Sequence, residues 1–485
     1  MNLLSKPFTE NGNYLCTWDL QEKIALKLNI EGENIPVKQR NCLTDNMLFG
    51  ENSLFHVVPK EYLGGIYFLI DDGWDVPFGT NTNISKAPFG SLILDDKKFE
   101  GYGDTPTERL KTLNQKVKAM GYCGLGLWVS PQIPFENQKT TMADHRKHWC
   151  ERAKWSNDAG VKYWKIDWGE HAFRRDYLEM MTQCIRENAP DLLIEHAVVH
   201  TPFGGPKTPE DDVAKKMANI MEVSDFFRTY DVCEPFSNTI TLCRTNALLC
   251  NVQKDNFLYN AKGYVNIESS PEIAAGLGLN MGIMAYNGNV GACLNWQRLA
   301  PPMSIFDADY IKSDELLTDS AFFETSPVWW YNAKGQEISS TVPAITARGT
   351  KLPKVEADSL KPFVMASCNN KTKAYAVSTL KRCFDMNKSV VAPAKITVFP
   401  ENLTAPIGVF GYYKTLCIEF EKAIPKNAKI YAQCLLETQA KDVTENVTID
   451  GNKLIIDGKN LRLWGRKSDA IGDSEDPALI LQIII

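Results

Sequence analysis

The sequence lacks the features that mark several large classes of protein. None of its apolar runs approaches the roughly 20 residues of a membrane-spanning helix, and residues 1–10 lack the charged start and apolar core of a signal peptide. The net charge is -6, and no basic cluster is interleaved with aromatic residues, which argues against a nucleic-acid partner. We expect no membrane association, and a chain that is either cytoplasmic or exported with its signal peptide already absent. Nothing in the sequence fixes the oligomeric state.

The motifs of common cofactor and metal sites are also missing. The 13 cysteines are scattered and form no CxxC pair, which favours buried free thiols over disulfides or zinc ligands. The six histidines form neither HExxH nor another compact ligand spacing, so we predict no metal site. There is no GxGxxG after a strand, no P-loop and no GxSxG. We therefore predict that the protein uses no cofactor.

What is present describes an ordinary globular chain with two parts. Its 485 residues, 44% hydrophobic and 23% charged, exceed what one core usually fills. From about residue 14 to 287, short apolar strands alternate with longer amphipathic stretches, as in a (β/α)8 TIM barrel. Eight strands are predicted at residues 14–18, 65–71, 124–129, 161–167, 192–196, 224–231, 264–268 and 282–286.

The pattern changes after about residue 340. Helical periodicity gives way to short alternating runs, for example at 374–378, 395–398 and 416–420, with turn residues between them. This spacing is typical of an antiparallel β-sandwich. We predict a catalytic barrel with its N-terminal segment over residues 1–335 and an all-β domain over residues 340–485.

The most informative segment is residues 163–169, which reads Tyr-Trp-Lys-Ile-Asp-Trp-Gly. It runs apolar and aromatic, as a buried strand does, and then delivers Lys165 and Asp167. Charges at such a place must be desolvated, paired or used in function. A buried salt bridge at a strand end is the structural alternative.

Polar residues follow other predicted strands as well. Asp71 and Asp72 end the second strand, Glu195 lies in the fifth, and Arg228 and Asp231 lie in the sixth. The Asp-Asp-Gly sequence could also serve as a helix cap or an Asx-turn. In a TIM barrel, however, the substrate binds at the C-terminal ends of the strands, so these side chains are expected to converge on one pocket.

Because the sequence contains no metal-binding or nucleotide-binding motif, its paired carboxylates favour glycoside hydrolysis. One acid attacks the anomeric carbon, and a second protonates the leaving oxygen and then activates water. Lys165 shares a strand face with Asp167 and would favour its ionised form. Burial among the aromatic residues at 226, 227 and 230 would keep Asp231 protonated. Asp225 competes with Asp231 for the role of acid.

Four motifs together resemble the α-galactosidase clan of glycoside hydrolases, clan D with families 27 and 36. They lie at residues 70–74, 124–131, 165–167 and 228–231, in the order found in the clan. The resemblance implies a retaining mechanism with Asp167 as nucleophile and Asp231 as acid/base. It also implies the substrate-binding residues Trp18, Asp71, Asp72, Trp128, Lys165 and Arg228. We add Glu195 to these residues because of its position in a predicted strand.

The resemblance makes a carbohydrate the expected partner and leaves the sugar open. α-Galactose is the default, while N-acetylgalactosamine and β-L-arabinopyranose are the alternatives within the clan. A retaining enzyme holds its two carboxyl groups about 5 to 5.5 Å apart, which we predict for Asp167 and Asp231. A sugar-binding barrel without turnover is the rival class.

Overall fold

The computed structural model describes residues 1–51, 53–81, 88–197, 210–229, 237–268, 270–323, 336–385, 388–466 and 476–485. Its first half is a closed barrel of eight parallel strands that follow one another in chain order, which confirms the predicted TIM barrel. The strands are β1 (Tyr14–Cys16), β2 (Tyr67–Ile70), β3 (Gly124–Val129), β4 (Tyr163–Ile166), β5 (Leu193–His196), β6 (Phe226–Arg228), β7 (Tyr264–Glu268) and β8 (Asn280–Ile283).

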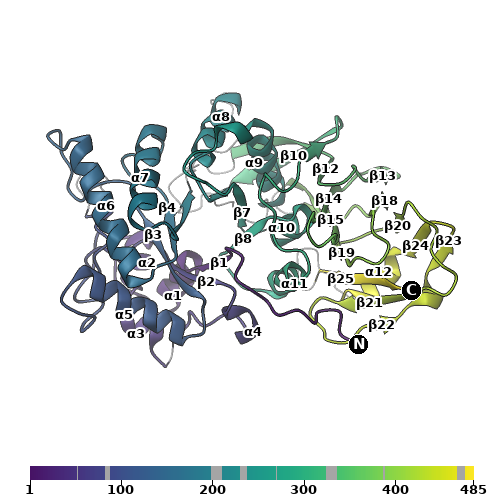
Figure 1. Ribbon diagram of the computed structural model, residues 1–485, viewed down its shortest axis with the longest axis horizontal. Helices are drawn as coiled ribbons and strands as arrows, with labels where there is room; N and C mark the ends of the chain where they lie inside the picture. The colour runs from purple at the N-terminus through teal and green to yellow at the C-terminus, as the bar shows by residue number, and fades with distance from the viewer. Residues whose placement is uncertain are drawn as a thin grey trace.

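Helices surround the barrel and connect its strands (Figure 1). Helix α5 begins with a capping box between Thr105 and Glu108, and α6 begins with another between Thr141 and Asp144. Among the helices of the described residues, none is both long and apolar enough to cross a membrane. The helices of this half are α1 (Trp18–Lys27), α2 (Ile35–Asn41), α3 (Asp45–Phe49), α4 (Lys60–Leu63), α5 (Pro106–Ala119), α6 (Met142–Ala159), α7 (Arg175–Asn188), α8 (Glu210–Met221), α9 (Ser237–Asn251), the 3-10 helix η2 (Lys254–Asn256), α10 (Pro271–Leu277) and α11 (Gly288–Gln297).

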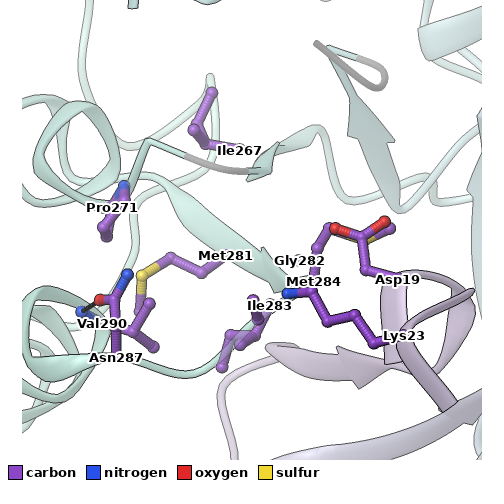
Figure 2. Close-up of a pocket in the computed structure, with 11 residues that line it drawn as sticks. Asp19, Lys23, Ile267, Pro271, Met281, Gly282, Ile283, Met284, Asn287 and Val290 are labelled. Carbon is purple, nitrogen blue, oxygen red and sulfur yellow. Dashed lines mark hydrogen bonds between the residues drawn. The ribbon is translucent and has the colours of Figure 1, made fainter. Parts of the chain in front are cut away.

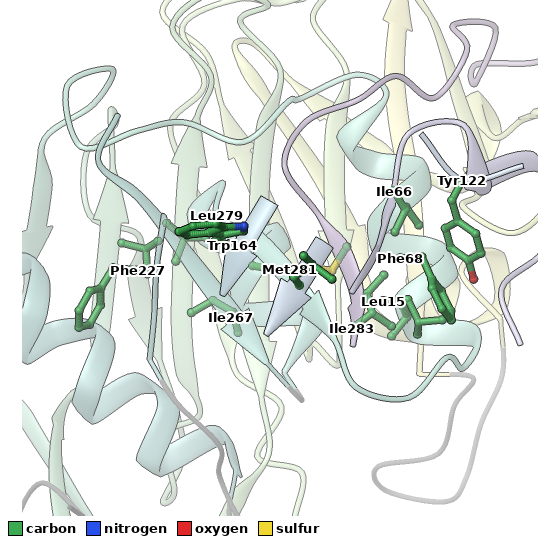
Figure 3. Close-up of a cluster of buried hydrophobic side chains, with 14 of the residues drawn as sticks. Leu15, Ile66, Phe68, Tyr122, Trp164, Phe227, Ile267, Leu279, Met281 and Ile283 are labelled. Carbon is green, nitrogen blue, oxygen red and sulfur yellow. The ribbon is translucent and has the colours of Figure 1, made fainter. Parts of the chain in front are cut away.

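The side chains of each barrel strand alternate between two environments. Those that point outward, such as Leu15, Phe68 and Trp164, are buried in the core between strands and helices (Figure 3). Those that point inward, such as Tyr14 and Tyr163, belong to a separate interior cluster. The charged residues of the strands take the inward positions, so the fold gathers them inside the barrel.

The second half consists of β-sheets packed as a sandwich. The eight-stranded sheet has the order β22-β21-β25-β19-β15-β14-β12-β9, and the five-stranded sheet has the order β13-β18-β20-β24-β23. Most neighbours are antiparallel, while β12 and β14, β15 and β19, and β18 and β20 run parallel. An apolar core between the sheets includes Val377, Val409 and Leu416. The predicted β-sandwich is therefore present.

The elements of this half are β9 (Tyr310–Lys312), β10 (Leu316–Phe323), β11 (Gln336–Pro343), β12 (Ile345–Arg348), β13 (Lys354–Glu356), β14 (Phe363–Cys368), β15 (Tyr375–Leu380), β16 (Arg382–Asp385), β17 (Lys388–Val390), β18 (Lys395–Val398), β19 (Ile407–Phe410), β20 (Thr415–Glu419), β21 (Lys429–Cys434), β22 (Lys441–Asp442), η3 (Thr444–Asn446), β23 (Thr448–Asp450), β24 (Lys453–Asp457), α12 (Gly458–Trp464) and β25 (Ala478–Ile484). Strands β10 and β11 form a hairpin, as do β16 and β17.

The two halves are joined more closely than a boundary near residue 340 suggests. Strand β9 lies upstream of that point and pairs with β12 of the eight-stranded sheet. The N-terminal segment runs beside the C-terminal strands (Figure 1), where the amide of Leu3 donates to Gln433 Oε1 at 2.7 Å. The division into domains at residues 335 and 340 stays a prediction.

Candidate active site

Asp167 follows β4 directly and lies at the C-terminal end of the barrel. Its carboxylate oxygen Oδ2 accepts a hydrogen bond from Trp128 Nε1 at 3.0 Å and another from Arg228 Nη2 at 2.8 Å. The residue is only 5% exposed. An indole N–H and a guanidinium both favour the ionised carboxylate. The arrangement therefore holds Asp167 in a fixed orientation as an anion, which is the form a nucleophile needs.

Arg228, on β6, connects Asp167 to a second carboxylate. Its Nη1 lies 3.1 Å from both carboxylate oxygens of Glu268, the last residue of β7. Glu268 is 1% exposed, and Arg228 is fully buried. We did not predict Glu268 as a site residue, although it ends a predicted barrel strand just as Asp71 ends another. That position was the signal that could have found it.

The ion pair of Lys165 is with Asp71, although Lys165 shares a strand face with Asp167. Its Nζ lies 2.8 Å from Asp71 Oδ2 and 3.4 Å from Cys16 Sγ. Burial and the Arg228 charge act to lower the pKa of Lys165, but Asp71 and the other acidic neighbours raise it well above its usual value. Burial, followed by Asp71, raises the pKa of the Cys16 thiol, so Sγ–H donates to Asp71 Oδ2 at 3.0 Å. The site therefore contains a buried Lys-Asp ion pair.

Asp72 forms a separate ion pair with Arg40 of α2. Arg40 Nε donates to Oδ1 at 2.9 Å and Nη2 to Oδ2 at 2.8 Å, with both side chains buried. The Arg40 guanidinium also lies over the Phe89 ring, 4.9 Å from its centroid. The next residue after Asp72, Gly73, has a φ of +120°, and a Cβ there would lie 2.6 Å from Arg40 Cα. Glycine thus permits the close approach of α2 to this strand end.

Glu195 lies inside the barrel and is completely buried. Its Oε1 accepts from the Tyr14 hydroxyl at 2.9 Å, and its Oε2 accepts from the Tyr163 hydroxyl at 2.7 Å and from Asn266 Nδ2 at 2.8 Å. A carboxylate has about four acceptor positions, and three of them are used here. A direct contact of Glu195 with the substrate stays a prediction.

The two predicted tryptophans take different positions around the aromatic cluster of the barrel interior. Trp128 is buried, and its ring lies 6.1 Å from Phe89 and 5.3 Å from Trp168. Trp18 begins α1, is partly buried and packs against the same cluster. Phe89 and Trp168 belong to the same cluster but are not among the predicted substrate-binding residues.

Of the two candidates for the acid, only Asp225 lies among the residues that the structure describes. Asp231 lies outside the described residues, so its role and its separation from Asp167 stay predictions. Asp225 precedes β6, is fully buried and forms an ion pair with Arg186 of α7 at 2.7 Å. Its other oxygen accepts from the Ile194 amide at 3.0 Å. Asp225 thus lies at the end of β6 opposite Arg228 and faces a helix.

A cavity of about 440 Å³ lies beside β8 (Figure 2). Its walls come from α1, β7, β8 and the segments after them, and include Asp19, Lys23 and Met284. Met284 also belongs to the interior cluster that contains Trp128. Asp167 is not among the described residues that line this cavity, which is therefore adjacent to the predicted site and not centred on it.

No protein-family model and no curated protein matches this sequence. Solved structures that the chain resembles include a family 27 β-L-arabinopyranosidase from Geobacillus stearothermophilus in complex with arabinose, with 10% identity, a TM-score of 0.42, and 99% of this chain and 98% of that chain covered. Another is a Bacillus halodurans protein proposed to be an α-N-acetylgalactosaminidase, with 8% identity, a TM-score of 0.41 and coverages of 100% and 99%. A third is a Bacteroides fragilis protein proposed to be an α-galactosidase, with 12% identity, a TM-score of 0.39 and coverages of 99% and 80%. These solved structures include proteins of the clan whose motifs the sequence resembles, but at such values the likeness supports no conclusion about activity.

Proposed function

We propose that this protein is a retaining, exo-acting glycoside hydrolase with an α-galactosidase-like specificity. The observation that carries the proposal is the position of Asp167 at the C-terminal end of β4, where Trp128 and Arg228 both donate to its Oδ2. A carboxylate oriented by two donors at the active-site end of a TIM barrel suits the nucleophile of a double displacement.

The proposed reaction proceeds in two steps. Asp167 attacks the anomeric carbon, the glycosidic bond breaks, and Asp231 gives its proton to the leaving oxygen. A water molecule then attacks the same carbon, Asp231 takes a proton from it, and the bond to Asp167 breaks. The products are the free sugar with retained configuration and the released alcohol. The assignment of Asp231 rests on the sequence resemblance alone.

The remaining residues would bind the sugar. Asp71 and Lys165, already paired at 2.8 Å, offer an acceptor and a donor to neighbouring hydroxyl groups. Asp72 would add a second acceptor, because its bonds to Arg40 use about half of its lone-pair positions. Trp18 and Trp128 would supply apolar surface for the ring. α-N-Acetylgalactosaminide and β-L-arabinopyranoside are alternative substrates of the same chemistry.

The rival proposal is a barrel that binds sugar without turnover. Hydrolysis of an aryl α-galactoside distinguishes the enzyme from the sugar-binding protein, and it is measured through the release of the aryl alcohol. We expect activity in the wild type and none above background in Asp167→Asn. Asp225→Asn is the matched control, because it also changes a buried carboxylate paired with arginine but lies at the other end of β6. It should lower stability and retain activity per folded molecule.

Absence of turnover on a panel of aryl α-galactosides, α-N-acetylgalactosaminides and β-L-arabinopyranosides would favour the binding role. Activity that survives in Asp167→Asn would reject this residue as nucleophile. Product analysis separates hydrolysis from transfer to a second sugar, because both pass through the same covalent intermediate.

A further inference from the structure

Three side chains from the part of the chain that follows β3 and β4 hold possible metal-ligand atoms close together. They are Glu136, in the segment between β3 and α6, His145 on α6, and His171, in the segment between β4 and α7. One ligand atom from each residue lies within 4.8 Å of the other two. The ligands come from three separate stretches, which explains why the histidine spacing in the sequence gave no indication of them.

The geometry around His171 favours a shared ligand over a simple hydrogen bond. Its Nε2 lies 2.9 Å from Glu136 Oε1. Nevertheless, Nε2 is buried and makes no hydrogen bond within the part of the chain that the structure describes. The two atoms are close, but an N–H on Nε2 would not point at the carboxylate oxygen. A nitrogen and an oxygen placed in this way can both donate electron pairs to a third atom between them.

His145 is oriented by groups behind it. Its Nδ1 lies 2.8 Å from the Tyr177 hydroxyl, which also accepts from Trp149 Nε1 at 2.8 Å. The His171 ring stacks on the Tyr177 ring at 4.2 Å between centroids. If Nδ1–H donates to Tyr177, the lone pair of His145 Nε2 is available for a ligand. A metal-bound histidine typically donates its other N–H in this manner.

We propose that Glu136, His145 and His171 form a binding site for a divalent transition-metal ion, with Zn²⁺ as the best fit. Two histidines and one glutamate form a known zinc ligand set that leaves a fourth position for water. Ligand atoms about 2.0 to 2.2 Å from a tetrahedral ion lie about 3.3 Å from one another, so modest side-chain movement would complete the site. The ion would link the segment after β3 to the segment after β4, which begins with Asp167.

This site is separate from the proposed catalytic centre. Tyr177 and Trp149, which support it, belong to the core between strands and helices, whereas Trp128 belongs to the barrel interior. The inference therefore does not depend on the proposed glycosidase activity. We expect the ion to stabilise the fold and to have no part in bond cleavage.

The test uses the full chain, stripped with a chelator and titrated with Zn²⁺ alone by calorimetry. A Cys250→Ser background removes the thiol that is exposed among the described cysteines and that could bind zinc by itself. We expect about one ion per chain and a rise in the melting temperature with Zn²⁺ concentration. Glu136→Gln and His171→Ala should each weaken binding at least about tenfold, whereas His56→Ala, at an exposed histidine, should not.

Two results would overturn the proposal. One is the absence of a Zn²⁺-dependent shift in the wild type, and the other is unchanged binding in both ligand variants. Should His171→Ala fail to fold, Glu136→Gln retains the side-chain shape and still decides the question. The absorption spectrum of bound Co²⁺ gives an independent readout, because loss of a ligand changes the coordination geometry.

Discussion

Replacing Glu268 with glutamine tests whether the buried charges behind Asp167 act as a unit. Glu268 holds Arg228 Nη1 with both oxygens at 3.1 Å, and Arg228 Nη2 holds Asp167 at 2.8 Å. The glutamine side chain has nearly the same shape but no charge and only one acceptor oxygen. The Nη1 group of Arg228 then loses its charged partner, so the charge environment of the nucleophile changes and Arg228 is held less firmly against Asp167.

The magnitude follows from the burial of the pair. Removing one partner from a buried ion pair costs about 3 to 5 kcal/mol in stability, and the remaining amide oxygen of glutamine should reduce the loss to about 2 to 4 kcal/mol. A misplacement of about 1 Å in a catalytic group can lower the rate about 100-fold. We therefore expect Glu268→Gln to unfold at lower denaturant concentration and to lose about 10- to 100-fold in kcat/KM.

Asp319→Asn is the matched control. Asp319 is a buried carboxylate on β10 whose Oδ1 accepts from Arg382 Nε at 2.6 Å, within the β-sheet half. Its replacement should reduce stability by a similar amount and leave kcat/KM unchanged. Equal activity losses in both variants would mean that Glu268 acts only through stability. Full activity in Glu268→Gln would refute the link between Glu268 and Asp167.

Two further predictions concern a hydrogen bond to Asp167 and the dependence of stability on pH. Trp128→Phe removes the N–H that donates to Asp167 Oδ2 at 3.0 Å. A hydrogen bond to a charged group contributes about 1.5 to 3 kcal/mol, so kcat/KM should fall about 10- to 100-fold; an unchanged kcat/KM would contradict this. Burial lowers the pKa of His196 to about 3, from a usual 6.5. Below pH 6.5 the unfolded chain binds a proton that the folded chain excludes, so stability falls as pH decreases toward 3, by about 1.4 kcal/mol per unit. In His196→Gln, the side-chain amide can still donate to Thr182 at the position of Nε2. Urea unfolding between pH 6.5 and 3 should therefore show a smaller fall in the free energy of unfolding for this variant than for the wild type.

The sequence predicted the barrel well where strands are continuous apolar runs. β3 has the predicted bounds, because it is apolar and buried throughout. β7 also has the predicted bounds, although it includes the polar residues Asn266 and Glu268. β8 was predicted at residues 282–286 but runs from Asn280 to Ile283. Asn280 is completely buried, and its side chain donates to the Asn11 carbonyl at 2.6 Å. A hydrophobicity pattern gives no reason to begin a strand at such a polar residue.

The partners of the charged residues could not be predicted. Lys165 shares a strand face with Asp167, but its ion pair is with Asp71, which is 94 positions away in the sequence. Arg40 comes from a short helix before β2 and carried no recognisable motif. These pairings depend on how the barrel closes and on which neighbouring strand supplies the nearest opposite charge. Residue types at strand ends indicate where a site lies, but they do not indicate which of its charged residues form ion pairs with each other.

The proposed chemistry is tested most directly by trapping the covalent intermediate. A fluorinated, activated α-galactoside that forms the glycosyl-enzyme but hydrolyses slowly is incubated with the protein, which is then digested and analysed by mass spectrometry. We predict one sugar per chain on the peptide that contains Asp167, and no such adduct in Asp167→Asn. An adduct on a different carboxylate, or turnover that gives the inverted sugar without any adduct, would contradict Asp167 as the nucleophile of a retaining enzyme.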